Sequence, residues 1–436
     1  MKTIKHNGFL LIIYLLTAVL FIVYDPPLGL MDDFGRVGLV EMMKINFTET
    51  YMTWMDHRIF DKGMFQPLYL IQALLQYSLY FEYGSLPIYI LNALIVFSTH
   101  FVFVKGLNKF LKNEINYTHS LLIFLILPYT YDLFIHPSLQ TKLIFLFFGI
   151  SLFLHQKKNE NNLYILLIFL TGFLIPLIKL QGAIFIFFYL VLIYKDRSLL
   201  SKSVFTGYII GFSIQAYVVL FLDGSYFVIK NSISNIISNF LHPYNILTLI
   251  FTILFLSVMK KKLDLFLISI VLSLLSLMFL YLNWSIYGYL LASYSYMISF
   301  LSTPLLAELS KFLKIKFITN TNFIFIIFLI SLSTFFIPRL ERWSDLRILY
   351  TDLEEQNIGT LYYCASEGTM FLNKISRSEN NIIQINHFND IIEKEFNLIH
   401  DSYCGNNFYN DSTNCNLNYV TKNDNYGYVF IAKYKC

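Results

Sequence analysis

A long series of apolar stretches runs through the sequence, each near the length that a helix needs to cross a membrane. Such a helix needs about 20 consecutive apolar residues. Of the 436 residues, 56% are hydrophobic and only 14% are charged, whereas soluble domains carry about 25% charged residues. The composition therefore requires a lipid bilayer. The predicted crossings are 8–24, 86–104, 119–135, 138–154, 162–178, 180–194, 203–222, 244–259, 264–283, 286–307 and 318–337.

The distribution of basic residues predicts how the chain is threaded. Lys2 and Lys5 place the N-terminus on the cytoplasmic side, because basic loops stay inside. The later basic loops fall on that same side only if the apolar stretch 64–83 does not cross. We therefore predict that 64–83 is a helix lying along the outer face, with its glutamines toward protein or water. The later basic loops are 105–112, 157–158, 195–202, 260–262 and 311–316.

This threading gives about eleven crossings, with the N-terminus cytoplasmic and the C-terminus outside. The predicted fold class is an all-α polytopic membrane protein with a small α+β extracytoplasmic C-terminal domain. Residues 1–338 form the transmembrane module, which includes an outer loop, 25–85. Residues 339–436 form the tail domain, because the apolar runs stop near Pro338 and the sequence becomes rich in Asn, Asp and Tyr.

All of the cysteines lie in this tail. Four cysteines confined to one small outward domain indicate two disulfides in an oxidising compartment. Three pairings are possible, and a zinc site would favour closer pairs such as Cys-x-x-Cys. Within the tail we expect a helix over 387–400 and a strand over 426–432. The cysteines are Cys364, Cys404, Cys415 and Cys436.

Two adjacent aspartates follow the first apolar stretch. In a helix, Glu41 would lie on the same face as Asp33, and Arg36 would lie on the neighbouring stripe. A carboxylate pair at the mouth of a lipid-embedded body can act as a general base. The alternative is that one aspartate caps a short helix starting near Phe34, with Arg36 as its ion-pair partner. The two interpretations are compatible, because a cap also fixes a carboxylate in space.

Two lysines and a histidine are predicted on the same outer face. Lys179 interrupts an otherwise apolar run, where a lysine must either snorkel to the interface or meet an anion. Lys142 lies one turn into another helix from that face, after His136. Two cations and a histidine on one side can hold a phosphorylated lipid headgroup.

Aromatic residues mark another outer turn. Trp284 and Tyr287 lie between two late apolar stretches. They are candidates for stacking on a sugar ring of an acceptor, although an interfacial aromatic belt is the commoner explanation for such residues. Basic residues fall in short loops and form no stripe, so the sequence indicates no nucleic-acid partner.

The order of these motifs resembles that of the GT-C membrane glycosyltransferases, which include the lipid A aminoarabinose transferases and protein O-mannosyltransferases. In that family the Pro-Leu-Tyr helix lies on the outer surface, in agreement with the threading from charges. Total length, outer domains at both ends and a cysteine-bearing tail are most similar to the phage-type serotype-converting O-antigen glucosyltransferases. The matching segments are 32–36 (Asp-Asp-Phe-Gly-Arg), 66–70 (Gln-Pro-Leu-Tyr-Leu) and 179–182 (Lys-Leu-Gln-Gly).

The resemblance implies an inverting enzyme on the periplasmic face of the bacterial inner membrane. It would move a hexose, glucose in the nearest family, from a polyprenyl-phosphate donor to a lipid-linked O-antigen polysaccharide. Asp33 or Asp32 would be the base and Lys179, with Lys142, would meet the phosphate. Such a scheme requires no cofactor, and a divalent metal at the paired carboxylates remains compatible with it. His136 would assist at the phosphate, and Arg36 and Glu41 would support the base.

The sequence departs from the family pattern at two places. An aspartate stands at the second acidic position, where glutamate is common, and 136–138 reads His-Pro-Ser where an Arg-Pro-Asp-type turn is expected. These departures leave the donor and the choice of base open. A polysaccharide polymerase is the nearest alternative, but its large outer loop would fall between later helices. A flippase would show an internal repeat, and none is evident.

Overall fold

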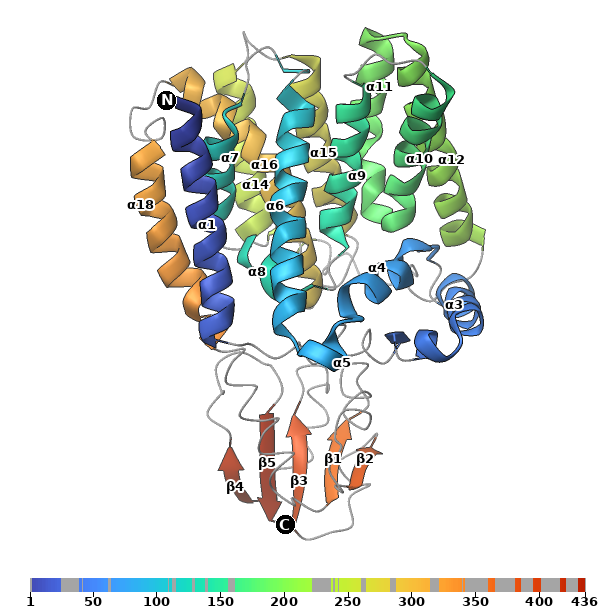
Figure 1. Cartoon of the computed structure of the whole chain (residues 1–436), viewed down its shortest axis with the longest axis vertical. Coiled ribbons are helices and arrows are strands. Elements are labelled where there is room, and N and C mark those ends of the chain that lie inside the picture. The colour runs from blue at the N-terminus through green and yellow to red at the C-terminus, as the bar shows by residue number, and fades with distance from the viewer. Residues whose placement is uncertain are drawn as a thin grey trace.

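The chain folds into a helical bundle with a small sheet formed by its C-terminal part (Figure 1). The computed structural model describes residues 2–24, 39–40, 42–61, 64–108, 110–111, 115–127, 130–137, 140–155, 161–221, 237, 240–241, 243–259, 264–282, 288–313, 321–338, 340–341, 360–364, 381–385, 395–400, 416–420 and 430–435.

Most of the helices run side by side, alternately up and down the bundle (Figure 1). Their sequences are apolar on nearly every side, which is typical of helices that face either lipid or other helices. The helices of the bundle are α1 (Lys2–Tyr24), α6 (Leu86–Asn108), α7 (Tyr117–Ile126), α8 (Thr130–Ile135), α9 (Thr141–His155), α10 (Asn162–Ile178), α11 (Ile186–Lys195), α12 (Leu199–Phe221), α14 (Pro243–Met259), α15 (Leu265–Leu282), α16 (Gly288–Leu313) and α18 (Thr321–Ser331), the last extended by a π-helical turn, η4 (Leu332–Phe336).

Asparagines fix where several helices begin. The side chain of Asn116 accepts a hydrogen bond from the backbone N–H of His119 at 3.2 Å, at the start of α7. Asn161 does the same for Tyr164 at the start of α10, at 2.9 Å. Each asparagine thereby satisfies a backbone donor that has no partner within the helix.

The helices follow the predicted apolar stretches, with two differences. The stretch 119–135 is not one helix, because α7 ends at Ile126 and α8 begins at Thr130. The Thr130 hydroxyl donates to the carbonyl oxygen of Phe124 at 2.7 Å, which stabilises the break. The stretch 180–194 begins as a 3₁₀ helix, η2 (Leu180–Phe185), before α11 continues it.

Two of the helices are long and apolar enough to cross a membrane by length and composition. They are α6 and α12, each of 23 residues. The other apolar segments are shorter, at 10–17 residues, when only residues with described side chains are counted, although some belong to longer helices such as α1, α15 and α16. The number of crossings therefore stays a prediction.

Glycines allow α10 and α12 to pack closely. A Cβ atom at Gly207 would lie 2.2 Å from the carbonyl oxygen of Phe169, and one at Gly211 would lie 2.2 Å from that of Phe173. The two glycines form a Gly-x-x-x-Gly pattern on α12, a pattern by which helices in lipid bring their backbones together. This contact fixes the end of α10, where Lys179 follows.

We expect Gly211→Val to destabilise the protein by about 2 kcal/mol. The added atoms would meet a backbone carbonyl, which cannot rotate away, so the two helices must separate. Thermal unfolding of the purified protein in detergent measures the loss. Ser213→Val is the matched control, because Ser213 is exposed on the same helix. Equal effects of the two substitutions would contradict close α10–α12 packing.

Three short helices lie across the end of the bundle opposite the N-terminus (Figure 1). Gln66, Gln72 and Gln76 are buried, which confirms that the glutamines of 64–83 face protein. That this segment lies along the bilayer stays a prediction. The helices are α3 (Phe47–Asp56), continued by the π-helical turn η1 (His57–Asp61), then α4 (Leu68–Tyr77) and α5 (Tyr80–Tyr83).

The sheet lies beyond this same end (Figure 1), in the strand order β2-β1-β3-β5-β4. Strand β1 pairs in parallel with β2 and β3, and β5 pairs antiparallel with β3 and β4. The strands are β1 (Thr360–Cys364), β2 (Asn381–Ile385), β3 (Glu395–His400), β4 (Asn416–Val420) and β5 (Phe430–Lys435).

The sheet corrects one prediction for the tail and supports another. The helix expected over 387–400 is wrong for residues 395–400, which form β3, and the remainder lies outside the described residues. The strand expected over 426–432 is confirmed from Phe430 onward. Whether 339–436 is a separate domain stays a prediction. So do the disulfides, since Cys364 ends β1 while Cys404, Cys415 and Cys436 lie outside the described residues.

Candidate functional site

Helix α4 turns its polar side toward the protein. Leu75 is 67% exposed on its outer side and Ile71 is 39% exposed, whereas Gln72 and Gln76 are buried on the inner side. This is the reverse of a helix on a soluble protein, where apolar residues face the core. The protein interior beneath α4 therefore contains polar side chains, although it is shielded from solvent.

The two glutamines form a bonded amide pair. Gln72 Nε2 donates to Gln76 Oε1 at 2.7 Å and also approaches the carbonyl oxygen of Pro137 at 3.5 Å. Gln72 Oε1 and Gln76 Nε2 have no hydrogen-bond partner within the described part of the chain. Buried polar atoms are nearly always paired, so these two atoms mark an unusual place in the structure.

A buried lysine shares the same carbonyl. Lys142, at the start of α9, donates from Nζ to the carbonyl oxygen of Pro137 at 2.7 Å and to Asn92 Oδ1. Its side chain is completely buried. A buried ammonium is costly unless polar atoms surround it, and these oxygens supply part of that stabilisation. Lys142 and the glutamine pair thus belong to one polar network that meets at Pro137.

Asn92 extends the network to a third helix. From α6, its Nδ2 donates to the carbonyl oxygens of Leu133 and Phe134 at 2.7 and 2.8 Å. These carbonyls lie in the last turn of α8, where backbone acceptors have no partner within the helix. Asn92 therefore holds α6, α8 and the Lys142 ammonium together, and it fixes the turn that carries His136 and Pro137.

Lys179 lies in a rigid turn between α10 and η2. Its backbone is extended, with φ −162° and ψ 147°, and its carbonyl accepts from the N–H of Gly182 at 2.8 Å. A Cβ atom at Gly182 would lie 2.3 Å from the carbonyl oxygen of Ile175, so this position requires glycine. The Tyr208 hydroxyl donates to the carbonyls of Gly182 and Ala183 at 3.1 and 2.6 Å. The Lys-x-x-Gly segment is thus held from both sides, and Lys179 is half-buried.

The structure brings part of the predicted site together. Lys142 lies in the polar network, and His136 directly precedes Pro137 in it. Helix α10, which Lys179 directly follows, contacts α4. The other candidates lie outside the described residues: Asp32, Asp33, Arg36, Glu41, Trp284 and Tyr287.

Asn92 was not among the site residues predicted from the sequence. The signal was present, because an asparagine inside the apolar stretch 86–104 must find partners to be tolerated there. Its partners lie some forty to fifty positions further along the chain, so hydropathy alone does not reveal them. The role of Lys142 at a phosphate stays a prediction. Its described contacts show that it also links α9 to Asn92 and to Pro137.

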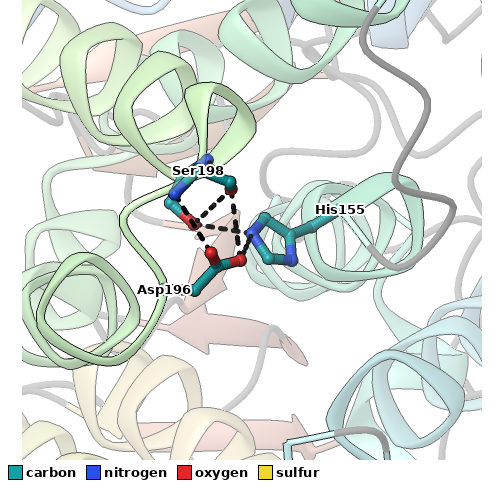
Figure 2. Close-up of polar contacts among 4 residues, drawn as sticks. His155, Asp196 and Ser198 are labelled. Carbon is teal, nitrogen blue, oxygen red and sulfur yellow. Dashed lines mark hydrogen bonds and ion pairs between the residues drawn. The ribbon is translucent and has the colours of Figure 1, made fainter.

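A second polar cluster lies between the end of α9 and the start of α12, and Figure 2 shows it. His155 Nε2 lies 3.0 Å from Asp196 Oδ2 and 2.6 Å from Ser201 Oγ. Ser198 donates to Asp196 from its backbone N–H at 3.0 Å and from its hydroxyl at 3.1 Å. The contacts of His155 with Asp196 and Ser201 are both made by its Nε2 atom. The cluster connects the two helix ends.

The charge of Asp196 is stabilised within this cluster. Burial alone would raise the pKa of Asp196, but the hydrogen bonds from Ser198 and Ser201 and the neighbouring His155 outweigh that effect. Its pKa therefore lies below the ordinary value for aspartate, and the carboxylate stays ionised at neutral pH. Across the described ranges, no three His, Cys, Asp or Glu side chains gather in a way that could hold a metal ion.

No protein-family model and no curated protein matches the sequence. The structure is similar to the crystal structure of ArnT from Cupriavidus metallidurans in the apo state, with a TM-score of 0.54 over 98% of each chain at 9% identity. The chain therefore shares the fold of that structure, in agreement with the fold that the resemblance of its motifs implied. The closer resemblance to the phage-type serotype-converting enzymes stays a prediction.

Proposed function

We propose that this protein is an inverting glycosyltransferase of the bacterial inner membrane. It transfers a hexose, with glucose as the first candidate, from a polyprenyl-phosphate donor to a lipid-linked O-antigen polysaccharide. The observation that carries the proposal is the GT-C fold, shared with ArnT over 98% of both chains. The polar network beneath α4 supports it, because a transferase acting on lipid-linked sugars needs polar groups at the edge of its membrane body.

The proposed threading has about eleven crossings, a cytoplasmic N-terminus and a periplasmic C-terminal domain. An odd number of crossings places the two ends of the chain on opposite sides. In support, Figure 1 shows the N-terminus at one end of the bundle and the sheet at the other, beyond α3 and α4. Loop 25–85 and the tail 339–436 would then share the periplasmic face.

The proposed reaction is a single displacement at the anomeric carbon. Asp33 or Asp32 removes the proton of an acceptor hydroxyl as its oxygen bonds to that carbon. The bond from the carbon to the donor phosphate oxygen breaks, the configuration inverts, and polyprenyl phosphate leaves with the bonding electrons. A phosphate is a good leaving group, so positive charge from Lys179 is sufficient assistance. His136 and Lys142 would support that charge from the adjacent turn.

Lys179→Ala should weaken use of the donor. Losing one charge-assisted contact to a phosphate corresponds to a rise of about tenfold or more in the donor KM, whereas Lys179→Arg should retain much of the affinity. The measurement is the dependence of transfer rate on donor concentration in membrane vesicles. Lys202→Ala serves as the control, because Lys202 is exposed at the start of α12. An unchanged donor KM would argue against a phosphate contact.

The function itself is tested on cells. The O-polysaccharide of cells with and without this chain is compared by mass spectrometry and linkage analysis. One added side-branch hexose is the expected result. Altered polysaccharide length would instead favour a polymerase, and accumulated untranslocated intermediates would favour a flippase.

A further inference from the structure

We propose that the Gln72–Gln76 amide pair on α4 binds hydroxyl groups on the sugar of the lipid-linked donor. This inference rests on the proposed function and names the part of the site that recognises the sugar.

The amide pair has one oxygen and one nitrogen without a hydrogen-bond partner among the described residues. Gln72 is 6% exposed and Gln76 is 2% exposed, and a single bond of 2.7 Å joins them. An amide offers one acceptor oxygen and one donor nitrogen. Two amides joined by one bond therefore leave one oxygen and one nitrogen over, whichever way each amide is turned. Leaving both unpaired costs about 1–3 kcal/mol for each group, unless a ligand meets them.

The two open atoms have different requirements, and together they determine which ligand fits. The open nitrogen needs an acceptor, and the open oxygen needs a donor. A phosphodiester carries no proton at neutral pH, so it can pair with the nitrogen alone, and a lipid chain can pair with neither. A sugar hydroxyl both donates and accepts, and neighbouring hydroxyls on a pyranose present both functions side by side. The pair therefore matches a sugar.

The amide pair also lies next to the buried Lys142. The amide pair and Lys142 meet at the carbonyl oxygen of Pro137, directly after His136. In a glycosyl phosphate the sugar is bonded directly to the phosphate, so groups that bind its hydroxyls must lie beside groups that bind the phosphate. Two more buried polar atoms on the same turn have no partner among the described residues, Gln140 Nε2 and Thr141 Oγ1.

The test uses Gln72→Leu and Gln76→Leu in the full-length protein in detergent. Thermal shifts are measured with polyprenyl-phosphate glucose, galactose and mannose, and with bare polyprenyl phosphate. The wild type should bind one glycosylated lipid more tightly than the bare lipid. In each variant that preference should fall about tenfold, while binding of the bare lipid stays unchanged. Without lipid, each single variant should melt at a slightly lower temperature, because it breaks the bond between the two amides and leaves the remaining amide unpaired. The variant with both substitutions should melt at the wild-type temperature or above, because it removes both buried amides.

The control is Thr99→Val. It removes a buried hydroxyl of α6 that, like the two amide atoms, has no partner among the described residues. It should keep the sugar preference of the wild type. Variants that keep this preference would overturn the inference and leave the proposed function standing. A fall of several degrees in the melting temperature of the variant with both substitutions would also overturn it, because the amides would then be structural. A wild type that binds none of the lipids would reject the proposed function and this inference together.

Discussion

Asp33→Asn will abolish sugar transfer while the protein still inserts in the membrane. An amide cannot take up the proton of the acceptor hydroxyl, and a general base contributes about 10²–10⁴-fold to rate. Asp32→Asn is made in parallel, because the sequence leaves open which aspartate is the base. The measurement is transfer of radiolabelled hexose from a polyprenyl-phosphate donor in vesicles that contain equal amounts of protein.

Asp56→Asn is the matched control, since Asp56 is an exposed carboxylate of α3 in the same outer segment. It should transfer at the wild-type rate. If the aspartates act only as helix caps, their loss should lower stability by about 1 kcal/mol and leave the rate nearly unchanged. Wild-type glycan modification in both variants would reject the base assignment.

Hydropathy predicted the positions of most helices of the bundle, because a helix in an apolar stretch satisfies its backbone groups internally. It did not predict the break between α7 and α8. That break depends on one hydroxyl, since Thr130 bonds the carbonyl of Phe124 within an apolar run. A threonine has the same average hydropathy whether it caps a helix or lies within one.

The tail was harder to predict, because its structure depends on pairing between distant residues. Residues 395–400 form β3, which lies between β1 and β5 in the sheet. Strand preference depends strongly on such neighbours, and these partners lie thirty or more positions away along the chain. A local pattern in the sequence therefore favoured a helix there.

The site shows the same division. The sequence predicted that the glutamines of 64–83 face protein or water, and the structure shows that Gln72 and Gln76 face protein. The partners of Lys142 could not be predicted, because Asn92 meets it from a helix fifty positions away. From the sequence, the lysine is simply a cation near the outer face. In the structure the lysine also connects α9 to Asn92 of α6 and to the turn that follows α8.

Asn92→Leu should be among the most destabilising substitutions in the helical body, with a loss of about 3 kcal/mol. It leaves the carbonyls of Leu133 and Phe134 without their donor and removes one oxygen from the buried Lys142 ammonium. Lys142→Met removes the charge itself and should cost about 1–2 kcal/mol. The double variant should lose clearly less than the sum, because no ammonium remains to be stabilised. Unfolding of the purified proteins in detergent measures the three losses.

Asn108→Leu provides the matched comparison. Asn108 also bonds backbone groups, the carbonyl and N–H of Ile115 at 2.9 and 2.7 Å, but the described bonds of its side chain involve no charge. Its loss should therefore add to that of Lys142→Met without coupling. Additive losses for Asn92 and Lys142 would mean that other groups hold the ammonium. The same variants separate two roles of Lys142: if it is only structural, the double variant transfers sugar at nearly the wild-type rate. If it also meets the donor phosphate, both Lys142→Met variants lose donor affinity, although the double variant has regained stability relative to Asn92→Leu.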